Sequence, residues 1–177
     1  MRYGKVIDGV IIENPIERIE LKVDKYRICN PKGDMSEYGY YQADDDVIPS
    51  FDSRFQNIVF GLWVFNGSKF SREVSAEYKP IAEIREIKDL EIANKCVVKI
   101  DAVLSPYDRE YAQARMSYYL NLIQQGSELD IIQQADKVSI ESAFQAMAGI
   151  RQESDNIRAA IKTETNIETI ISMDFAE

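Results

Sequence analysis

The residues with the greatest potential for chemistry are three consecutive aspartates, Asp44-Asp45-Asp46, with Asp52 close behind them. Carboxylate oxygens are the ligands that Ca²⁺ takes in proteins. An EF-hand loop also needs a central glycine and a distant bidentate glutamate, and this segment lacks both. The sequence therefore favours a solvated acidic loop over a calcium site, and we predict no metal.

Catalytic motifs are absent from the sequence. It contains no histidine, which is the commonest general base and metal ligand. It also lacks the glycine-rich phosphate loops, the CxxC pair and the GxSxG nucleophile motif. Cys29 and Cys96 lie far apart, and we expect both to be reduced and mostly buried. Scattered carboxylates leave a glycosidase-like pair open, but we predict a non-enzyme without catalytic or cofactor-binding residues.

Aromatic residues give the candidate partner-binding site. Tyr38, Tyr40 and Tyr41 flank Gly39, and the single tryptophan is Trp63. Tyrosine and tryptophan provide large contact area at small entropic cost and are enriched at protein interfaces. In the alternative interpretation, Tyr38 and Tyr40 face a small β core while Tyr41 lies at its wet rim. Both interpretations remain open from the sequence.

Charge is divided unevenly along the 177 residues, whose net charge is −9. Residues 1–79 carry 11 basic and 13 acidic side chains, a net charge of −2, whereas residues 80–177 carry 10 and 17, a net charge of −7. The acidic half would repel phosphates, so we predict no nucleic-acid partner. The apolar runs are too short to cross a bilayer and the N-terminus is polar, so we expect a soluble, intracellular chain without membrane contact.

Residues 1–79 have the pattern of a small antiparallel β domain. Asp8-Gly9 suits a type I′ turn between strands at 5–7 and 10–12, and Asn14-Pro15 is expected to end that pair. Further strands are expected at 18–23 and 26–29. A two-residue turn at Asn66-Gly67 predicts a long hairpin over 58–78, whose incoming strand is apolar on both faces and should be covered on both.

From Pro80 onward the hydrophobic period becomes helical, which predicts an acidic α-helical domain over 80–177. We expect helix boundaries at five sites, namely Ser105-Pro106, Gly126, Ser127, Ser139 and Thr165. The fold class is then α+β, a small antiparallel β module followed by a helical bundle or a helical hairpin. The short join near residue 79 allows either a fixed or a hinged arrangement.

Helical spacing also predicts which faces are buried. The first helix is expected to bury a stripe that includes Ile84 and Val97 and to leave Lys88 largely outside it. The second helix is expected to turn Tyr111 and Tyr118 toward the bundle. Tyr107 and Tyr119 are also assigned to the bundle core rather than to a partner.

Several stretches of the sequence carry a resemblance to known proteins. In the N-terminal half these are MRYGKVIDGVIIENP, an Asn-Pro-x-Gly followed by EYGYYQ, and the strand pair around WVFNGSKF. In the C-terminal half they are SPYDREYAQARMSYYLNLIQQG and IRAAIKTETNIETIISMDF. Together they resemble tail-fibre-associated or tail-fibre assembly proteins of tailed bacteriophages. The similarity covers most of the chain. It is architectural, so it transfers no functional residues.

The resemblance implies a protein that binds a tail fibre or another tail protein and assists its assembly, in the host cytoplasm or in the virion tail. A permanent structural subunit of the baseplate, adaptor or fibre attachment point is the alternative, and a small glycan hydrolase is an alternative of another class. The chain can also form a homo-oligomer. For the partner contacts we predict Tyr38, Tyr40, Tyr41 and Trp63.

Overall fold

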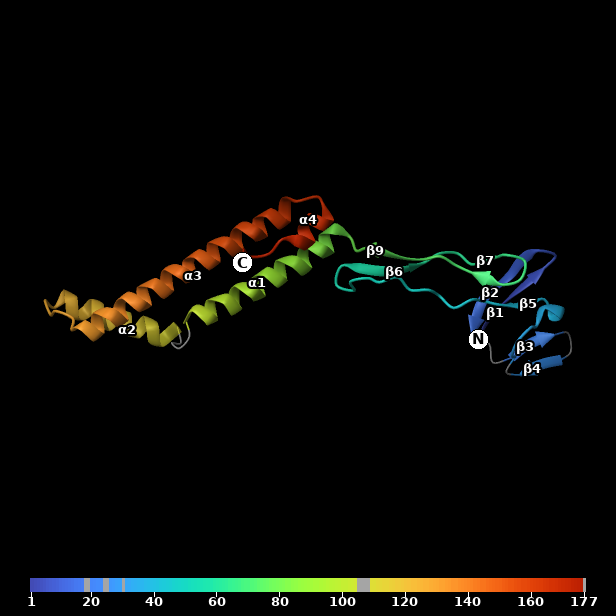
Figure 1. The fold of residues 1–177 in the computed structure, drawn as a ribbon, viewed down its shortest axis with the longest axis horizontal. Helices are drawn as coiled ribbons and strands as arrows, with labels where there is room; N and C mark the ends of the chain where they lie inside the picture. Colours follow the sequence, from blue (N-terminus) through green and yellow to red (C-terminus); the bar gives the residue numbers. More distant parts are fainter. Residues whose placement is uncertain (18–19, 24–25, 30, 105–108, 177) are drawn as a thin grey trace. The chain divides into compact units, whose positions relative to one another are not determined.

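The computed structural model describes residues 1–17, 20–23, 26–29, 31–104 and 109–176. Internal contacts divide the chain into two units, Met1–Lys79 and Pro80–Glu177. The first unit contains antiparallel strands and the second contains helices (Figure 1), so the α+β class is confirmed. Among the described helices, none is long and apolar enough to cross a membrane.

A three-stranded sheet in the order β2-β1-β5 forms the centre of the first unit. Its strands are β1 (Arg2–Ile7), β2 (Val10–Glu17) and β5 (Tyr40–Gln42). Asp8 and Gly9 have φ angles of 51° and 78°, and these positive values are what the predicted type I′ turn requires. The predicted end of the pair at Asn14-Pro15 is wrong, because irregular pairing opposite Gly4 lets β2 continue to Glu17.

Three two-stranded pairs complete the first unit. They are β3 (Glu20–Val23) with β4 (Tyr26–Cys29), β6 (Gln56–Phe60) with β9 (Val74–Tyr78), and β7 (Val64–Phe65) with β8 (Phe70–Ser71). The single long hairpin predicted over 58–78 is therefore divided into two pairs. Its turn is also longer than predicted. Phe65 pairs with Phe70, and Asn66 Oδ1 accepts the main-chain N–H groups of Ser68 and Lys69 at 3.0 and 2.9 Å.

Among the described residues of the first unit, buried side chains form two small clusters. Tyr3 and Tyr40 make the first, and Val6, Ala43 and Phe70 make the second. Gly4 allows the second cluster to close, because a Cβ at this position would lie 2.6 Å from the Phe70 ring. The expected cover over both faces of the incoming strand is absent in the described unit, where the Phe60 and Leu62 side chains are exposed.

The second unit is a long antiparallel helix pair with two additions, which matches the helical-hairpin alternative. Its helices are α1 (Ile81–Leu104), α2 (Arg109–Gln124), α3 (Ile131–Thr163) and α4 (Ile167–Ser172). Helices α1 and α3 lie side by side (Figure 1), α2 packs against α3, and α4 packs against α1. The side chains buried in this unit are mainly aliphatic and are spaced by helical turns: Ile84, Ile92, Leu104, Ile140, Met147, Ile161 and Ile170.

Helix boundaries follow the sequence only in part. Gly126 has a φ of 77° and ends α2 as expected, since its geometry suits a left-handed C-cap. Asp130, rather than Ser127, forms the capping box, with Gln133 as its partner. Helix α3 then runs without a break through Ser139, where a new helix was expected. Asn166 rather than Thr165 caps α4, and the predicted boundary at 105–106 lies outside the described residues.

The buried face of α2 differs from the predicted one by a single residue. Tyr119 is buried and Tyr118 is exposed, although the sequence placed both in the core. Tyr111 is also exposed, and Tyr107 lies outside the described residues. The Tyr119 hydroxyl donates a 2.6 Å hydrogen bond to Asp136 on α3, which fixes the face of α2 that turns inward.

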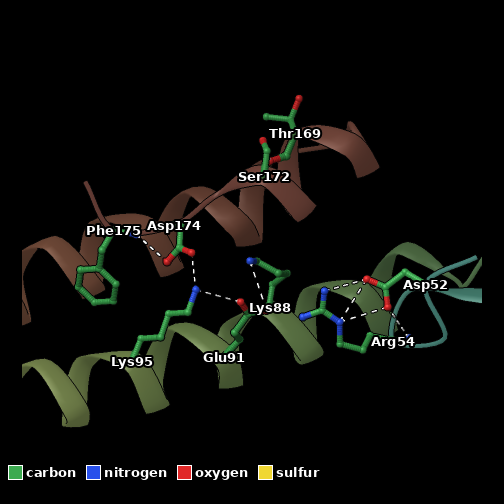
Figure 2. A network of polar contacts seen from close by, with 9 residues as sticks. All are labelled: Asp52, Arg54, Lys88, Glu91, Lys95, Thr169, Ser172, Asp174 and Phe175. Atoms are coloured by element: carbon green, nitrogen blue, oxygen red, sulfur yellow. Dashed lines mark hydrogen bonds and ion pairs between the residues drawn. The ribbon is translucent and has the colours of Figure 1, made fainter. Parts of the chain in front are cut away.

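The buried face of α1 also departs from the prediction. Lys88 is buried, whereas Val97 is exposed. Figure 2 shows the polar network on this helix, in which Lys88 and Glu91 form an ion pair at 3.4 Å. Cys96 is free and half-buried, so the expected burial holds only in part for it. The side chain of Cys29 lies outside the described residues.

Residues that follow α4 return to α1. Lys95 bridges Glu91 on its own helix and Asp174 beyond α4 (Figure 2). The hydrogen bond to Asp174 raises the pKa of Lys95, and the same bond lowers the pKa of the Asp174 carboxyl. The Phe175 side chain is buried beneath the ammonium of Lys99, which lies 5.1 Å from the ring centroid.

Candidate binding site

All four aromatic residues predicted to bind a partner lie in the first unit, but they occupy different environments. Tyr38 closes a short 3-10 helix, Ser36–Tyr38, and its side chain is exposed. A hydrogen bond with Glu37 raises the pKa of the Tyr38 hydroxyl. Tyr40 is only 3% exposed and packs on Tyr3. Burial in the core leaves Tyr40 little surface for a partner, which matches the core position that the alternative interpretation gives it.

Tyr41 lies between these two extremes. Its side chain is half-buried, and its ring centroid lies 4.6 Å from that of Phe65. This packing joins Tyr41 to the cluster around Phe70 while part of the residue remains accessible. Tyr41 therefore matches the rim position of the alternative interpretation.

Two arginines lie against the ring of Trp63, and an aspartate pairs with both arginines. The guanidinium carbons of Arg2 and Arg72 lie 5.1 and 4.4 Å from the centroid of its ring. Asp46 accepts two hydrogen bonds from Arg72, at 2.8 and 2.7 Å, and one from Arg2 at 2.7 Å. The hydrogen bond from Arg72, helped by that from Arg2, holds the pKa of Asp46 well below its usual range. The cluster orders the segment around Trp63 and leaves this ring half-buried.

The acidic run is an exposed loop, as the sequence favours, although some of its aspartates form ion pairs: the side chains of Asp44 and Asp52 are 51% and 42% exposed, and that of Asp46 is 14% exposed. Besides the paired Asp46, Asp44 accepts from Lys69 at 3.0 Å, and Asp52 binds Arg54. Asp45 is exposed. Within the described ranges, no three histidine, cysteine or acidic side chains gather as a metal site would require.

A pocket of about 530 Å³ lies beside Tyr41. Three separate segments line it, at residues 33–36, 41–42 and 67–69. Its polar groups include the side chains of Asp34, Gln42 and Lys69. Protein pockets of this size commonly hold small ligands or parts of larger ones. Of the four predicted residues, Tyr41 lines this pocket.

Sequence reasoning missed the residues that organise this region. Arg2 and Arg72 are 70 positions apart, and only the folded sheet brings both to Asp46. Gln42 has no motif around it, although it follows two of the predicted tyrosines directly. The sequence signals close to the pocket were the aromatic density at residues 38–41 and the turn at Asn66-Gly67. Neither signal identified Gln42, the polar residue that follows Tyr41.

No protein-family description, curated protein or solved structure matches this chain.

Proposed function

We propose that this chain is a non-enzymatic protein of a tailed bacteriophage that binds a tail fibre or another tail component and assists its assembly. The tail assignment rests on the resemblance of the sequence to tail-fibre assembly proteins. The observation that supports a binding role is the exposure of apolar side chains on an outer strand of the first unit. Val10, Ile12 and Ile16 of β2 are each more than half exposed.

The position of β2 favours contact with another chain. In the described part of the sheet, β2 pairs with β1 alone, so its other edge is open. Open edges with apolar side chains are sites where extended segments of partners add to a sheet. Pro15 and the irregular pairing opposite Gly4 interrupt this edge, and such features limit uncontrolled pairing in natural proteins.

A glycan hydrolase finds less support in the geometry. The general acid of such enzymes needs a carboxyl whose pKa is raised. Asp34, Asp46 and Asp52 of the first unit instead have lowered pKa values, because each accepts hydrogen bonds in its ionised form. No described observation favours this alternative over a binding protein.

Co-expression with the neighbouring tail-fibre protein, followed by size-exclusion chromatography, tests the proposal. We expect a complex with the wild-type chain and weaker binding after Ile12→Lys, which places a charge on the open strand. Val98→Lys is the matched control, because Val98, 68% exposed against 54% for Ile12, lies on α1. If the chain and the fibre protein elute separately under all conditions, the proposal is wrong.

Mass spectrometry of purified particles distinguishes the two tail roles. An assembly factor acting in the host cytoplasm should be absent from mature virions, whereas a permanent baseplate, adaptor or attachment subunit should be present at fixed stoichiometry. Size-exclusion chromatography of the chain alone also shows whether it forms a homo-oligomer.

A further inference from the structure

The apolar side chains of α1 lie on two faces of this helix. Ile84 and Ile92 are fully buried in the unit where α1 packs against α3 and α4. A second set, which we call the open stripe, consists of Leu90, Ala93, Val97, Ile100 and Leu104. Leu90 and Val97 are 63% and 58% exposed, although Leu104 is buried. The positions of the open stripe alternate by three and four residues, which is the spacing of a seam between two helices.

The opposite side of α1 is already covered. Lys88, Glu91 and Lys95 lie on this other side, where Asp174 binds Lys95 (Figure 2). At 3.6 residues per turn, these three positions lie roughly opposite the open stripe around the helix axis. The segment that follows α4 therefore closes one side of the α1–α3 pair, while the described residues leave Leu90 and Val97 uncovered on the other side.

Two cavities follow the open stripe between α1 and α3. The first, of about 460 Å³, is lined by Leu90 and Ala93 together with Ile161 of α3. The second, of about 610 Å³, is lined by the last three residues of the stripe together with Arg151 of α3. Because the stripe continues from one cavity to the next, both are parts of one groove, which we call the α1 groove. From Leu90 to Leu104 the groove is about 21 Å long, which about four turns of a partner helix would match.

Basic side chains are concentrated at the α1 groove. The helical unit, residues 80–177, has 10 basic and 17 acidic side chains in all. Half of the basic ones line the two cavities, namely Arg85, Arg109, Arg151, Arg158 and Lys162. Among the acidic ones, the cavity linings include only Glu86, Asp89 and Asp101. The groove is therefore a positively charged region in an acidic unit.

Two of the arginines at the groove keep their charge available for a ligand. Arg158 is already bound to Asp89. Arg109 and Arg151, in contrast, are exposed, and neither binds another residue that the structure describes. Both line the same cavity as Val97, so a ligand that covers this valine comes within reach of two guanidinium groups. Guanidinium groups bind carboxylates strongly, because they donate two parallel hydrogen bonds to them.

We propose that the α1 groove binds an amphipathic helix of a partner protein, with an apolar stripe and acidic residues beside that stripe. The seam spacing favours a helical ligand over an extended one, and the basic rim favours acidic side chains. A second copy of this chain fits less well, because a two-fold dimer at this face would bring two basic grooves together. The groove lies in a different unit from the β2 edge, so the inference goes beyond the proposed function.

A displayed library of helical peptides tests the proposal. Each peptide has leucine or isoleucine at positions that alternate by three and four residues, with the other positions randomised, and is selected against the full chain. We expect the selected peptides to be enriched in Asp and Glu beside the apolar positions. Val97→Lys should weaken their binding about tenfold or more. Val98→Lys is the matched control, because Val98 is 68% exposed and lies outside the open stripe.

Charge reversal tests the electrostatic part of the proposal. Arg109→Glu combined with Arg151→Glu should weaken the selected acidic peptides about tenfold. The same double variant should bind peptides in which lysine replaces those acidic residues better than the wild type does. Thermal unfolding followed by helical circular dichroism shows whether the variants fold. If a variant does not fold, the wild type decides, since its binding of acidic peptides must weaken as the salt concentration rises.

Several outcomes would overturn the proposal. They are a selection that yields no binding peptides, selected peptides without acidic enrichment, and equal binding of the peptides by Val97→Lys and Val98→Lys. Size-exclusion chromatography of the chain alone adds another. A dimer that Val97→Lys dissociates and Val98→Lys leaves intact would show that a second copy occupies the groove.

The outcome is separable from that of the proposed function. Ile12→Lys changes the β2 edge and should leave peptide binding at the α1 groove unchanged. If acidic helical peptides bind while no tail protein forms a complex, the groove stands and the tail function fails. If the fibre protein binds while no helical peptide does, the tail function stands and the proposal for the groove is wrong.

Discussion

Asp89 and Arg158, 69 positions apart in the sequence, form a two-point ion pair between α1 and α3. The Nε and Nη2 atoms of Arg158 each donate to a different carboxylate oxygen of Asp89 at 2.8 Å. Hydrogen bonding from Arg158 lowers the pKa of Asp89, and the same contact raises the pKa of Arg158. This pair fixes the alignment of the two long helices, which apolar contacts alone specify less strictly.

Replacing Asp89 should weaken the helical unit modestly. Because both side chains are about one-third exposed, we expect Asp89→Asn to lower the free energy of unfolding by about 1 kcal/mol or less. The contribution of Asp89 is complete above its unfolded pKa near 4 and falls as the pH drops toward the lower folded pKa. Urea unfolding followed by helical circular dichroism measures it. Asp101→Asn, an exposed change on the same helix, is the control, and equal stability of the two variants would contradict the prediction.

Replacing Asp46 should have a larger effect on the first unit. Its side chain is 14% exposed and serves two arginines, so Asp46→Asn should cost roughly 2 kcal/mol. Fluorescence of Trp63, the only tryptophan, reports the unfolding of this unit. Asp45→Asn at the exposed neighbouring position should change little.

The pH dependence of the same variant is a separate prediction. The folded pKa of Asp46 lies below its unfolded value, so its stabilisation persists above about pH 4 and declines below that pH. The difference in unfolding free energy between wild type and Asp46→Asn should therefore shrink on acidification. A difference that grows as the pH falls from about 5 to about 3 would contradict the assigned direction.

Substitutions of the tyrosines in the predicted binding surface should differ in their effect on the stability of the first unit. Tyr40→Ser removes a buried aromatic ring and should cost about 3 kcal/mol or more, whereas Tyr38→Ser at an exposed position should cost little. Thermal unfolding compares them. Partner binding should then be tested with Tyr38→Ser and Tyr41→Ser, because a variant that includes Tyr40 confounds binding with folding. Unchanged binding in both would remove these tyrosines from the contact surface.

Two glycines should respond in opposite directions to alanine. Gly149 lies inside α3 with nothing within 4 Å of its added Cβ, so Gly149→Ala should stabilise the helical unit by about 0.5–1 kcal/mol. At Gly4 the new Cβ would meet the Phe70 ring at 2.6 Å and the Glu13 carbonyl oxygen at 2.9 Å. Gly4→Ala should therefore destabilise the first unit by about 1–3 kcal/mol. Chemical unfolding of each variant checks both signs.

Local signals predicted the elements better than they predicted the contacts. The turn at Asp8-Gly9 and the helix end at Gly126 were predicted correctly, because a positive φ restricts the residue type at one or two positions. The face of α2 was misjudged because Tyr118 and Tyr119 are adjacent, and a hydrophobic pattern accepts either as the inward residue. The choice depends on Asp136, which belongs to a different helix.

For the candidate site, too, the sequence located the segment better than it predicted the contacts. The tyrosine-rich segment at 38–41 identified the region, but burial divided its members in a way that composition does not reveal. The fixing of Trp63 by Arg2 and Arg72 depends on chain segments that meet only after folding.

The return of residues beyond α4 to α1 has a consequence for the order of events during synthesis. Lys95 can form its ion pair only after Asp174, which is 79 positions later, has been synthesised. Asp89 likewise can pair only after Arg158 has been synthesised. At elongation rates of about 5 to 20 residues per second, about 3 to 16 seconds separate the appearance of each residue from that of its partner on the ribosome. Ile84 and Ile92 have no apolar neighbour from α3 or α4 during that interval, so the apolar face of α1 is open to aggregation or to capture by a chaperone before the helical unit closes.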